Sequence, residues 1–475
     1  MSAELSIYNT ASKKVEPFVP LTPGVARVYS CGPTVYHYVH IGNLRTFIFE
    51  DLLRRTLEYC GYAVKHIVNI TDVGHLTSDA DTGEDKMEKG AAREGKSVWD
   101  VAEYYTQSFY KDWERLNLKQ PSAWTKATAH IPEQIALVQT LEAKGFTYII
   151  PDDGIYFDTA KFPRYADFAG LDLKGMQEGH RIGVTEGKRN ASDFALWKFS
   201  PKDSKRAMEW DSPWGLGFPG WHAECSAMAM KHLGDTLDIH CGGTDLIRVH
   251  HTNEIAQSEC ATGHTFSRYW MHGSWLVEQP TADGGGGKMS KSSGEFVTLD
   301  LLLKKGYGAM DYRYFCLSAH YRQYLNFSWE AMDTARDSLK SLRRKTDPLV
   351  AKASSLASDN ALGWRKRFQA AISDDLGFPQ ALAVLNQMLK DPDLLDGEKG
   401  ALVLDFDQAL GLKLDEKDER AGTALPGPLA ALLEERKEAR ARKDWKRSDE
   451  IRDLLKEKGF GVKDNPDGTT NWFPI

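Results

Sequence analysis

The sequence has no uninterrupted apolar run of roughly 18 or more residues, so no segment reads as a membrane-spanning helix. Its first residues also lack the apolar stretch of a secretory signal. Cysteine is scarce, with six in 475 residues, which excludes a disulfide framework. These absences predict a cytoplasmic protein without a membrane partner, in which some thiols are available for metal binding or chemistry.

An excess of positive charge is absent too, because the formal net charge is −7. No global basic field therefore indicates a nucleic acid partner, although a local basic patch is enough to bind one. The apolar content of 41% is ordinary and allows sizeable cores to form. At 475 residues the chain is long enough for about two to four domains.

A strand, a helix and a second strand follow one another near the N-terminus. Residues 25–30 read as a buried strand, apolar residues between 44 and 59 recur at helical spacing, and residues 64–70 form the next strand. Such a unit joins parallel strands by a right-handed crossover. We therefore predict an α/β fold with a Rossmann-like parallel sheet. Ligands bind at the carboxyl ends of such strands, here around residues 31–43 and 69–72.

The rest of the chain changes character several times. Residues 97–145 have a helical pattern, and residues 146–205 are rich in strand and turn signals, which suggests an insertion into the nucleotide fold. From about residue 320 the pattern is helical. Residues 414–427 read as a linker, and we expect one charged helix and short strands after it.

The first chemical motif is His40-Ile-Gly-Asn43, which lies where the first strand passes into its helix. Gly42 would let an adenine ring approach the backbone, and a helix N-terminus offers N–H groups to phosphates. His40 and Asn43 are polar donors at the same corner. Taken alone, the motif is better explained as a capped helix start with an incidental histidine.

The second motif is Lys288-Met-Ser-Lys-Ser292, here named the lysine loop, and it follows a run of four glycines. Lys288 and Lys291 could fold over a triphosphate and stabilise the charge on departing pyrophosphate. The alternative is a solvated basic loop. In this order, the two motifs resemble the ATP-binding signatures of class I aminoacyl-tRNA synthetases.

That resemblance implies ATP-dependent activation of a carboxylic acid, with magnesium accompanying ATP. The residues it implies for ATP binding are His40, Gly42, Asn43, Lys288, Ser290 and Lys291, of which His40, Asn43, Lys288 and Lys291 would act in catalysis. Asn43 replaces the second histidine of the strictest form of the first motif. We expect this difference to weaken one phosphate contact and to leave the site in place.

A group of metal-ligating residue types forms the third feature. Cys225 ends the segment Gly220-Trp-His-Ala-Glu-Cys225, and His250 and Glu254 are four apart, which places them on one face of a helix. With Cys31, at the end of the first strand, they offer a plausible tetrahedral zinc site. Spacing alone leaves other donors open. The competing candidates are Cys241, Cys260, His240, His251 and Asp245.

These segments together resemble the cysteinyl-tRNA synthetases over nearly the whole chain. The matching segments, in order and spacing, are Cys31-Gly-Pro-Thr-Val-Tyr36, His40-Ile-Gly-Asn43, Gly220-Trp-His-Ala-Glu-Cys225, His250-His-Thr-Asn-Glu254 and the lysine loop. The resemblance implies one zinc ion per chain, on the floor of the amino-acid pocket, which binds the substrate thiol as a thiolate. Its implied ligands are Cys31, Cys225, His250 and Glu254.

Zinc would give this pocket its selectivity. A pocket that reads shape separates near-isosteres such as serine and cysteine by only about 10–200-fold, whereas a soft metal centre prefers a thiolate to a hydroxyl much more strongly. No segment is large enough for an editing domain. A closed structural zinc site is the alternative, because four protein ligands normally indicate one.

The resemblance also implies that Trp221 is a wall of the pocket and that Thr71 contacts the polar end of the substrate. The polar stretch after Asp72 departs from the family pattern.

A basic segment with an aromatic residue lies near the C-terminus, and it can hold phosphates and stack on an unpaired base. Without context, a solvated charged helix is the better explanation of this segment. The segment from Arg436 to Phe473 resembles the anticodon-recognition module of the family. The tRNA contacts that follow are Arg436, Arg440, Lys443, Trp445 and Arg447.

The resemblance and the chain pattern together give a division into domains. The expected parts are a catalytic domain in two halves (1–124 and 206–285), a connective insertion (125–205), the lysine-loop region with the beginning of a helical bundle (286–325), the bundle (326–413) and a small anticodon-recognition module (428–475).

We therefore expect a monomeric ligase that joins L-cysteine to tRNA(Cys) at the expense of ATP. Two alternatives remain at this point: a cysteine ligase on the same core with an amino-sugar acceptor, and a catalytically silent RNA-binding paralogue. The C-terminal module argues against the first, and the lysine-loop and zinc residues argue against the second.

Overall fold

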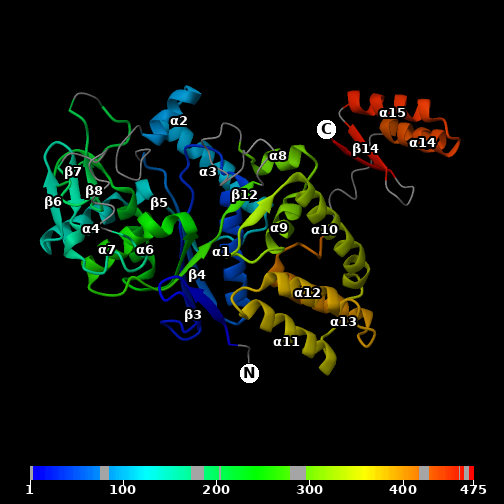
Figure 1. The fold of residues 1–475 in the computed structure, drawn as a ribbon, viewed down its shortest axis with the longest axis horizontal. Coiled ribbons are helices and arrows are strands. Elements are labelled where there is room, and N and C mark those ends of the chain that lie inside the picture. Colours follow the sequence, from blue (N-terminus) through cyan, green and yellow to red (C-terminus); the bar gives the residue numbers. More distant parts are fainter. Residues whose placement is uncertain are drawn as a thin grey trace.

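The computed structural model describes most of the chain (Figure 1). The described residues are 4–74, 85–172, 187–202, 205–278, 296–416, 427–458, 460–464 and 470–474. The lysine loop and the acidic stretch at 75–84 lie outside them. Within the described residues, no helix combines the length and the apolar character that a membrane span requires.

A five-stranded parallel sheet forms the centre of the catalytic region, in the order β11-β10-β3-β4-β5. Its strands are β3 (Val25–Ser30), β4 (Ala63–Ile70), β5 (Ala123–Lys126), β10 (Leu237–Gly243) and β11 (Ser267–Gly273). This sheet confirms the predicted α/β fold. Strand β3 lies between β4 and the much later β10, and a ligand crevice forms where two such strands end side by side.

Helix α1 (Ile41–Tyr59) connects β3 to β4 and is buried along most of its length. Its burial follows from its position, since the sheet lies on one side and the helical bundle on the other (Figure 1). The other helices of the catalytic region are α2 (Lys86–Glu94), α3 (Val98–Arg115), α4 (Ile131–Ala143), α6 (Trp221–Leu233) and α7 (Thr252–Thr262).

The helical prediction for residues 97–145 is wrong in the middle. The segment Ala123–Lys126 is β5, an edge strand that pairs in parallel with β4, and a short 3-10 turn, η1 (Ala127–His130), follows it. Four residues are too few to show a strand period. Pairing with β4 therefore decided the conformation, and the predicted domain boundary at residue 124 falls inside this strand.

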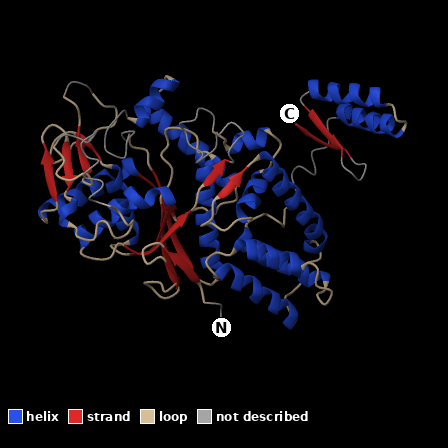
Figure 2. Ribbon diagram, viewed as in Figure 1, coloured by secondary structure: helices blue, strands red, loops and turns tan. Residues whose placement is uncertain are grey.

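The segment after α4 forms a separate four-stranded antiparallel sheet, in the order β6-β7-β8-β9 (Figure 2). Its strands are β6 (Thr147–Ile150), β7 (Gly154–Phe157), β8 (Phe194–Phe199) and β9 (Gly217–Pro219), with the 3-10 turn η2 (Thr159–Lys161) after β7. One face packs Phe157 and Leu196 against Leu141 of α4 and Ala223 of α6. This sheet therefore borders the start of α6, where Cys225 lies.

A helical bundle follows the catalytic region, as the pattern after residue 320 predicts. Its helices are α8 (Leu299–Lys304), α9 (Ala309–Leu317), α10 (Trp329–Val350), α11 (Asp359–Ser373), α12 (Phe378–Met388) and α13 (Asp396–Leu410). The short strands are β1 (Ser6–Asn9) with β2 (Lys14–Pro17), and β12 (Leu276–Glu278) with β13 (Leu325–Phe327).

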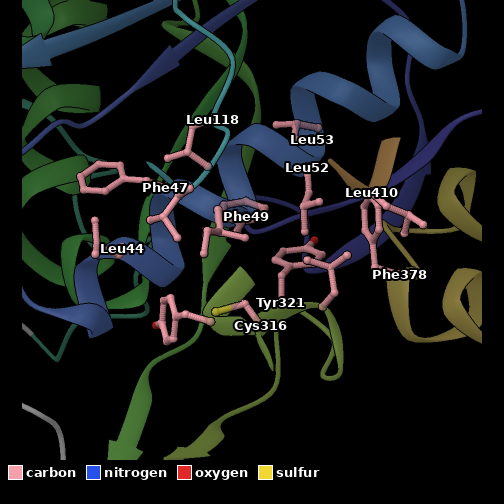
Figure 3. Close-up of a cluster of buried hydrophobic side chains, with 14 of the residues drawn as sticks. Leu44, Phe47, Phe49, Leu52, Leu53, Leu118, Cys316, Tyr321, Phe378 and Leu410 are labelled. Atoms are coloured by element: carbon pink, nitrogen blue, oxygen red, sulfur yellow. The ribbon is translucent and has the colours of Figure 1, made fainter. Parts of the chain in front are cut away.

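One hydrophobic core joins the bundle to α1 (Figure 3). Phe49 of α1 stacks on Tyr321 with ring centroids 4.6 Å apart, and Phe378 of α12 lies in the same cluster. A buried ion cluster adds to this junction, because Asp51 of α1 accepts from Arg55 at 2.7 Å and from Arg313 of α9 at 2.6 Å. The bundle therefore holds the helix that begins at the first ATP motif.

The C-terminal module has two helices where the sequence predicted one. Its elements are α14 (Gly427–Ala441), α15 (Trp445–Glu457), β14 (Phe460–Asp464) and β15 (Thr470–Pro474). Lys443 has a φ of 59°, which interrupts the helix, and Asp444 then caps α15 by accepting from the Arg447 N–H. The charged run hides this break, since lysine and aspartate have no strong breaking character. A small core of Leu429, Ile451 and Leu455 joins the helices.

Candidate metal centre and nucleotide-binding motifs

Two cysteines from distant segments meet at the carboxyl ends of β3 and β10. Cys31 follows β3 directly, and its N–H donates to the Cys241 carbonyl at 3.2 Å. Cys225 lies in the first turns of α6 and is 1% exposed. The Cys31 thiol hydrogen-bonds to Cys225, which lowers the pKa of Cys225, while burial and the Cys225 charge raise the pKa of Cys31. The shared hydrogen bond therefore favours ionisation of Cys225 before Cys31.

His250 and Glu254 come from the segment between β10 and α7. A 3-10 turn, η3 (Thr244–Leu246), and a π-helical turn, η4 (Ile247–His251), lead into α7, so the predicted regular helix begins with a π-turn. Such turns occur often at functional sites. His250 Nε2 lies 2.9 Å from Glu254 Oε1. The spacing of four thus brings the two side chains together.

The electrostatics of this pair favour charge on both groups. Burial disfavours the ionised Glu254, but His240 and His250 outweigh it and lower the pKa of Glu254. Burial also disfavours a charged His250, but Glu254 and Cys225 outweigh it and raise the pKa of His250. A metal ion would replace the protons held here, because metal binding releases protons from thiols and imidazoles.

The donor atoms of the four predicted ligands converge. One ligand atom from each of Cys31, Cys225, His250 and Glu254 lies within 4.8 Å of the others. Two sulfurs, one imidazole nitrogen and one carboxylate oxygen are a donor set that suits zinc. His222 Nδ1 lies 2.9 Å from His250 Nδ1, and such a contact orients a ligating imidazole. The residues present therefore fit a zinc ion.

The competing donors separate into two kinds. His240 and His251 form a second group with Cys31 and Glu254, again within 4.8 Å. Cys241, Cys260 and Asp245 belong to neither group among the described residues. Cys260 packs in the apolar core between α4 and the insertion sheet, where burial raises the pKa of its thiol to about 12.

The first ATP motif caps α1 at the same edge of the sheet. His40 is the N-cap residue, and its Nδ1 accepts from the Asn43 N–H at 3.2 Å. A Cβ at Gly42 would lie 2.9 Å from that Nδ1, so glycine leaves room for the histidine ring. The Ile41 N–H donates to the Val297 carbonyl at 2.9 Å. The chain leaving the lysine loop therefore runs beside His40, while Lys288, Ser290 and Lys291 lie outside the described residues.

The two predicted pocket residues have different surroundings. Trp221 lies beside His250 with ring centroids 4.3 Å apart and is half-buried. Thr71 is 2% exposed, its hydroxyl accepts from Asn69 Nδ2 at 3.0 Å, and its N–H donates to the Pro33 carbonyl. The Trp221 ring thus lies against one of the four candidate ligands, and Thr71 connects the ends of β3 and β4.

The predicted tRNA contacts are not equally accessible. Arg436 is 3% exposed, and its guanidinium makes a bidentate ion pair with Asp464 at 2.7 and 2.8 Å. This ion pair holds the Arg436 guanidinium within the module, and its tRNA contact stays a prediction. Arg440 pairs with Asp464 and Arg447 with Glu435, both at 2.7 Å. Trp445 is 57% exposed, and Lys443 is exposed beside it.

Sequence reasoning missed the roles of His222, His272 and Thr10 around the donor set. His251 Nδ1 lies 2.8 Å from His272 Nε2, and His272 Nδ1 lies 2.8 Å from Thr10 Oγ1. His222 could have been found, since it stands inside the segment that carries Cys225. Thr10 and His272 are 262 positions apart and carry no local signal.

Comparisons with known proteins agree with this geometry. The family model of the class I tRNA synthetase (C) catalytic domain matches residues 17–337, and that of the cysteinyl-tRNA ligase anticodon binding domain matches residues 423–472. A cysteine–tRNA ligase 1 from Burkholderia lata is 50% identical, covering 98% of this chain and 96% of the relative. A cysteine–tRNA ligase from Treponema denticola is 44% identical, covering 98% and 99%.

Solved structures extend the likeness to the fold. A Mycobacterium tuberculosis methionyl-tRNA synthetase bound by methionyl-adenylate superposes with a TM-score of 0.56 and 15% identity, covering 86% of this chain and 94% of that one. This similarity concerns the fold alone.

Proposed function

The chain belongs to the cysteinyl-tRNA ligase family of class I tRNA synthetases, and on this premise we propose that it activates L-cysteine with ATP and transfers the cysteinyl group to tRNA(Cys). The observation that carries the proposal is the convergence of Cys31, Cys225, His250 and Glu254 within 4.8 Å. This group lies at the carboxyl ends of β3 and β10, beside the N-terminus of α1.

Selection of cysteine over serine is the first task of the site. When bound, zinc supplies a soft Lewis acid that prefers a thiolate to a neutral hydroxyl. Cys31, Cys225, His250 and Glu254 would hold it, with the imidazole of His222 orienting His250. Trp221, whose ring lies beside that of His250, would cover the methylene of the substrate and exclude water. Thr71 would face the polar end of the substrate.

Activation joins two substrates without a protein nucleophile. A carboxylate oxygen of cysteine attacks the α-phosphate of ATP, the bond to the β-phosphate breaks, and pyrophosphate leaves with the bonding electrons. Gly42, His40 and Asn43 would place the phosphates at the N-terminus of α1. Lys288, Ser290 and Lys291 would close over the departing pyrophosphate, and magnesium would accompany ATP.

Transfer follows when the terminal ribose hydroxyl of tRNA attacks the carbonyl carbon of the adenylate and AMP leaves. The C-terminal module would bind the anticodon. Trp445 is exposed and can stack on an unpaired base, with Arg440 5.7 Å from its ring centroid. Lys443 and Arg447 would meet phosphates. We further propose that the protein works as a monomer in the cytoplasm.

Cysteinylation of purified tRNA tests the proposal. Full-length protein is incubated with ATP, magnesium, radiolabelled cysteine and tRNA, and label at the tRNA 3′ end is measured. We expect label on tRNA(Cys), abolished by periodate oxidation of its terminal ribose. A parallel reaction supplies an amino sugar in place of tRNA, and label on the amino sugar alone would favour the amino-sugar ligase. No label on any acceptor, from folded and metal-loaded protein, would favour the silent RNA-binding paralogue.

A further inference from the structure

Arg45, in the second turn of α1, is a buried arginine whose guanidinium binds main-chain carbonyls. Its Nη1 donates to the Ser274 carbonyl at 2.8 Å and to the Trp275 carbonyl at 2.6 Å. Its Nη2 donates to the Gln323 carbonyl at 2.6 Å and to the His320 carbonyl at 3.4 Å. One side chain of α1 therefore holds two segments that lie far apart in the sequence.

The two segments are the chain just before β12 and the chain just before β13, and these strands pair in parallel. The segments also bind each other, because the Ser274 N–H donates to the Tyr321 carbonyl at 2.8 Å. The Ser274 hydroxyl donates to the Arg322 carbonyl, again at 2.8 Å. Arg45 therefore fixes where this two-stranded ribbon, here named the β12–β13 ribbon, begins relative to α1.

The β12–β13 ribbon lies against the first ATP motif. Leu276, the first residue of β12, is 2% exposed. A Cβ at Gly42 would lie 3.8 Å from the Leu276 Cβ, which is an ordinary van der Waals contact. The lysine loop follows β12 in the sequence. The position of the ribbon therefore sets one wall of the turn that holds Gly42, and the place from which the chain continues toward the lysine loop.

The contacts of Arg45 differ from those of two other buried arginines at this junction. Arg55 and Arg313 both pair with the Asp51 carboxylate. Burial lowers the pKa of Arg45, and its four hydrogen bonds go to neutral carbonyls. A guanidinium presents its donors in a rigid planar fork, so the carbonyls that it binds are held at set positions. The contacts of Arg45 thus fix the geometry of the main chain.

We propose that Arg45 is a positioning residue for cysteine activation, which holds the β12–β13 ribbon against α1 and so sets the distance between the first ATP motif and the strand that leads toward the lysine loop. This inference rests on the proposed function. A misplacement of about 1 Å, caused by a mutation far from the chemistry, can cost about 100-fold in rate. Binding of ATP at the N-terminus of α1 should change little, since Arg45 acts through the ribbon.

Single-turnover release of pyrophosphate tests this role. Full-length protein in excess over ATP is mixed with cysteine and magnesium, and the rate constant is followed as the protein concentration rises. The plateau of the rate constant reports the chemical step whatever fraction of the protein is folded, and the midpoint reports ATP affinity. Arg45→Lys keeps the charge but replaces the planar fork by a compact ammonium. We expect the plateau to fall about 100-fold and the midpoint to stay within about threefold.

Arg55→Lys is the matched control. Arg55 lies on the same helix, is 7% exposed and also binds main-chain carbonyls, those of Gln408 at 3.0 Å and Asn117 at 2.6 Å. It should lose stability but keep the plateau, so equal plateaus for the two variants would overturn the proposal. Wild-type protein that releases no pyrophosphate with any amino acid would contradict the proposed function and this inference with it. An active wild type with an unchanged Arg45→Lys plateau would overturn this inference alone.

A milder variant carries the test if Arg45→Lys does not fold. Ser274→Ala removes only the hydroxyl contact with the Arg322 carbonyl. We expect its plateau to fall about two- to tenfold, the range that loss of one hydrogen bond gives. Ser318→Ala, at the end of α9, loses the same kind of contact, to the Phe315 carbonyl at 2.6 Å, and should keep the plateau. Equal plateaus for these two serine variants would also overturn the proposal.

Discussion

Glu254 lies one helical turn after His250, and its Oε1 atom is 2.9 Å from the Nε2 atom of that histidine. Both side chains are buried beside Cys31 and Cys225. Replacing a single oxygen of Glu254 therefore changes the charge and the donor set without changing the shape of the site.

Glu254→Gln should lose bound metal. An amide lacks the negative charge, and even loss of a hydrogen-bond partner of a metal ligand costs about 10–100-fold in affinity. We expect the zinc affinity to fall at least that far, which dialysis against a mild chelator would show as a lower zinc content. Glu259→Gln in the same helix, where Glu259 pairs with Arg164 at 2.7 Å, is the control and should keep its metal. Equal retention by both variants would argue against Glu254 as a ligand.

Gly42→Ala should weaken ATP binding. The added Cβ would come within 2.9 Å of His40 Nδ1 and 3.0 Å of its Cε1, so the ring must leave its place at the start of α1. A hydrogen bond to a charged group contributes about 1.5–3 kcal/mol, so we expect KM for ATP in pyrophosphate exchange to rise roughly ten- to a hundredfold. Gly363→Ala in α11, where a Cβ meets nothing within 4 Å, should leave KM unchanged. An unaltered KM in the first variant would show that His40 does not bind ATP from this position.

Asp51→Asn should destabilise the junction between α1 and the bundle. Asp51 is 1% exposed and pairs with both Arg55 and Arg313, and its loss leaves two buried guanidinium groups poorly compensated. Breaking a buried pair costs about 3–5 kcal/mol, which urea denaturation would detect as a lower midpoint. Asp337→Asn, which removes an exposed pair with Arg336, should cost less than about 1 kcal/mol. Similar midpoints for the two variants would contradict this account of the junction.

Glu50→Gln should stabilise the protein increasingly as pH rises. Burial raises the pKa of Glu50 well above its ordinary 4.5, so the folded protein retains a proton that the unfolded chain releases above that pH. The contribution of Glu50 to the free energy of unfolding is therefore fully present below about pH 4.5, and it declines as pH rises toward the folded pKa. The melting temperature of the variant should exceed that of the wild type more at about pH 8 than at about pH 5.

Glu58→Gln, in the same helix, should change the stability with pH in the opposite direction to Glu50→Gln. Burial disfavours its charge, but hydrogen bonds from Lys119 and Arg54 outweigh this and lower the pKa of Glu58, so its contribution is present above about pH 4.5 and is lost in acid. That variant should be less stable at about pH 8, with the difference shrinking as pH falls. A pH-independent effect of Glu50→Gln would mean that Glu50 is ionised in the folded state.

The fold could be predicted where the local signal was long. The run before Cys31 and the helical spacing from Leu44 to Tyr59 gave the β3–α1–β4 unit, because each is buried and regular. Strand β5 was missed because four residues between helices show no period. The break before Trp445 was missed because Lys443 adopts a left-handed conformation without being glycine or asparagine.

In the candidate site too, residues in short local motifs could be predicted from the sequence, and contacts between distant segments could not. Cys225, His250 and Glu254 stand in short motifs whose spacing suggests metal binding, although the choice among competing donors came from resemblance to a family. The outer contacts depend on chain segments that meet only in the folded sheet, as for Thr10 with His272 and for His222 with His250. No period or spacing in the sequence records such meetings.

Amino-acid-dependent exchange between ATP and pyrophosphate tests the central claim most directly, since it reports activation without tRNA. The assay compares cysteine with serine on purified protein of measured zinc content, beside Cys225→Ser and the buried-cysteine control Cys260→Ser. The account predicts exchange with cysteine and none with serine, lost in Cys225→Ser and kept in Cys260→Ser. Equal exchange with serine, or none with any amino acid from folded and zinc-loaded protein, would contradict it.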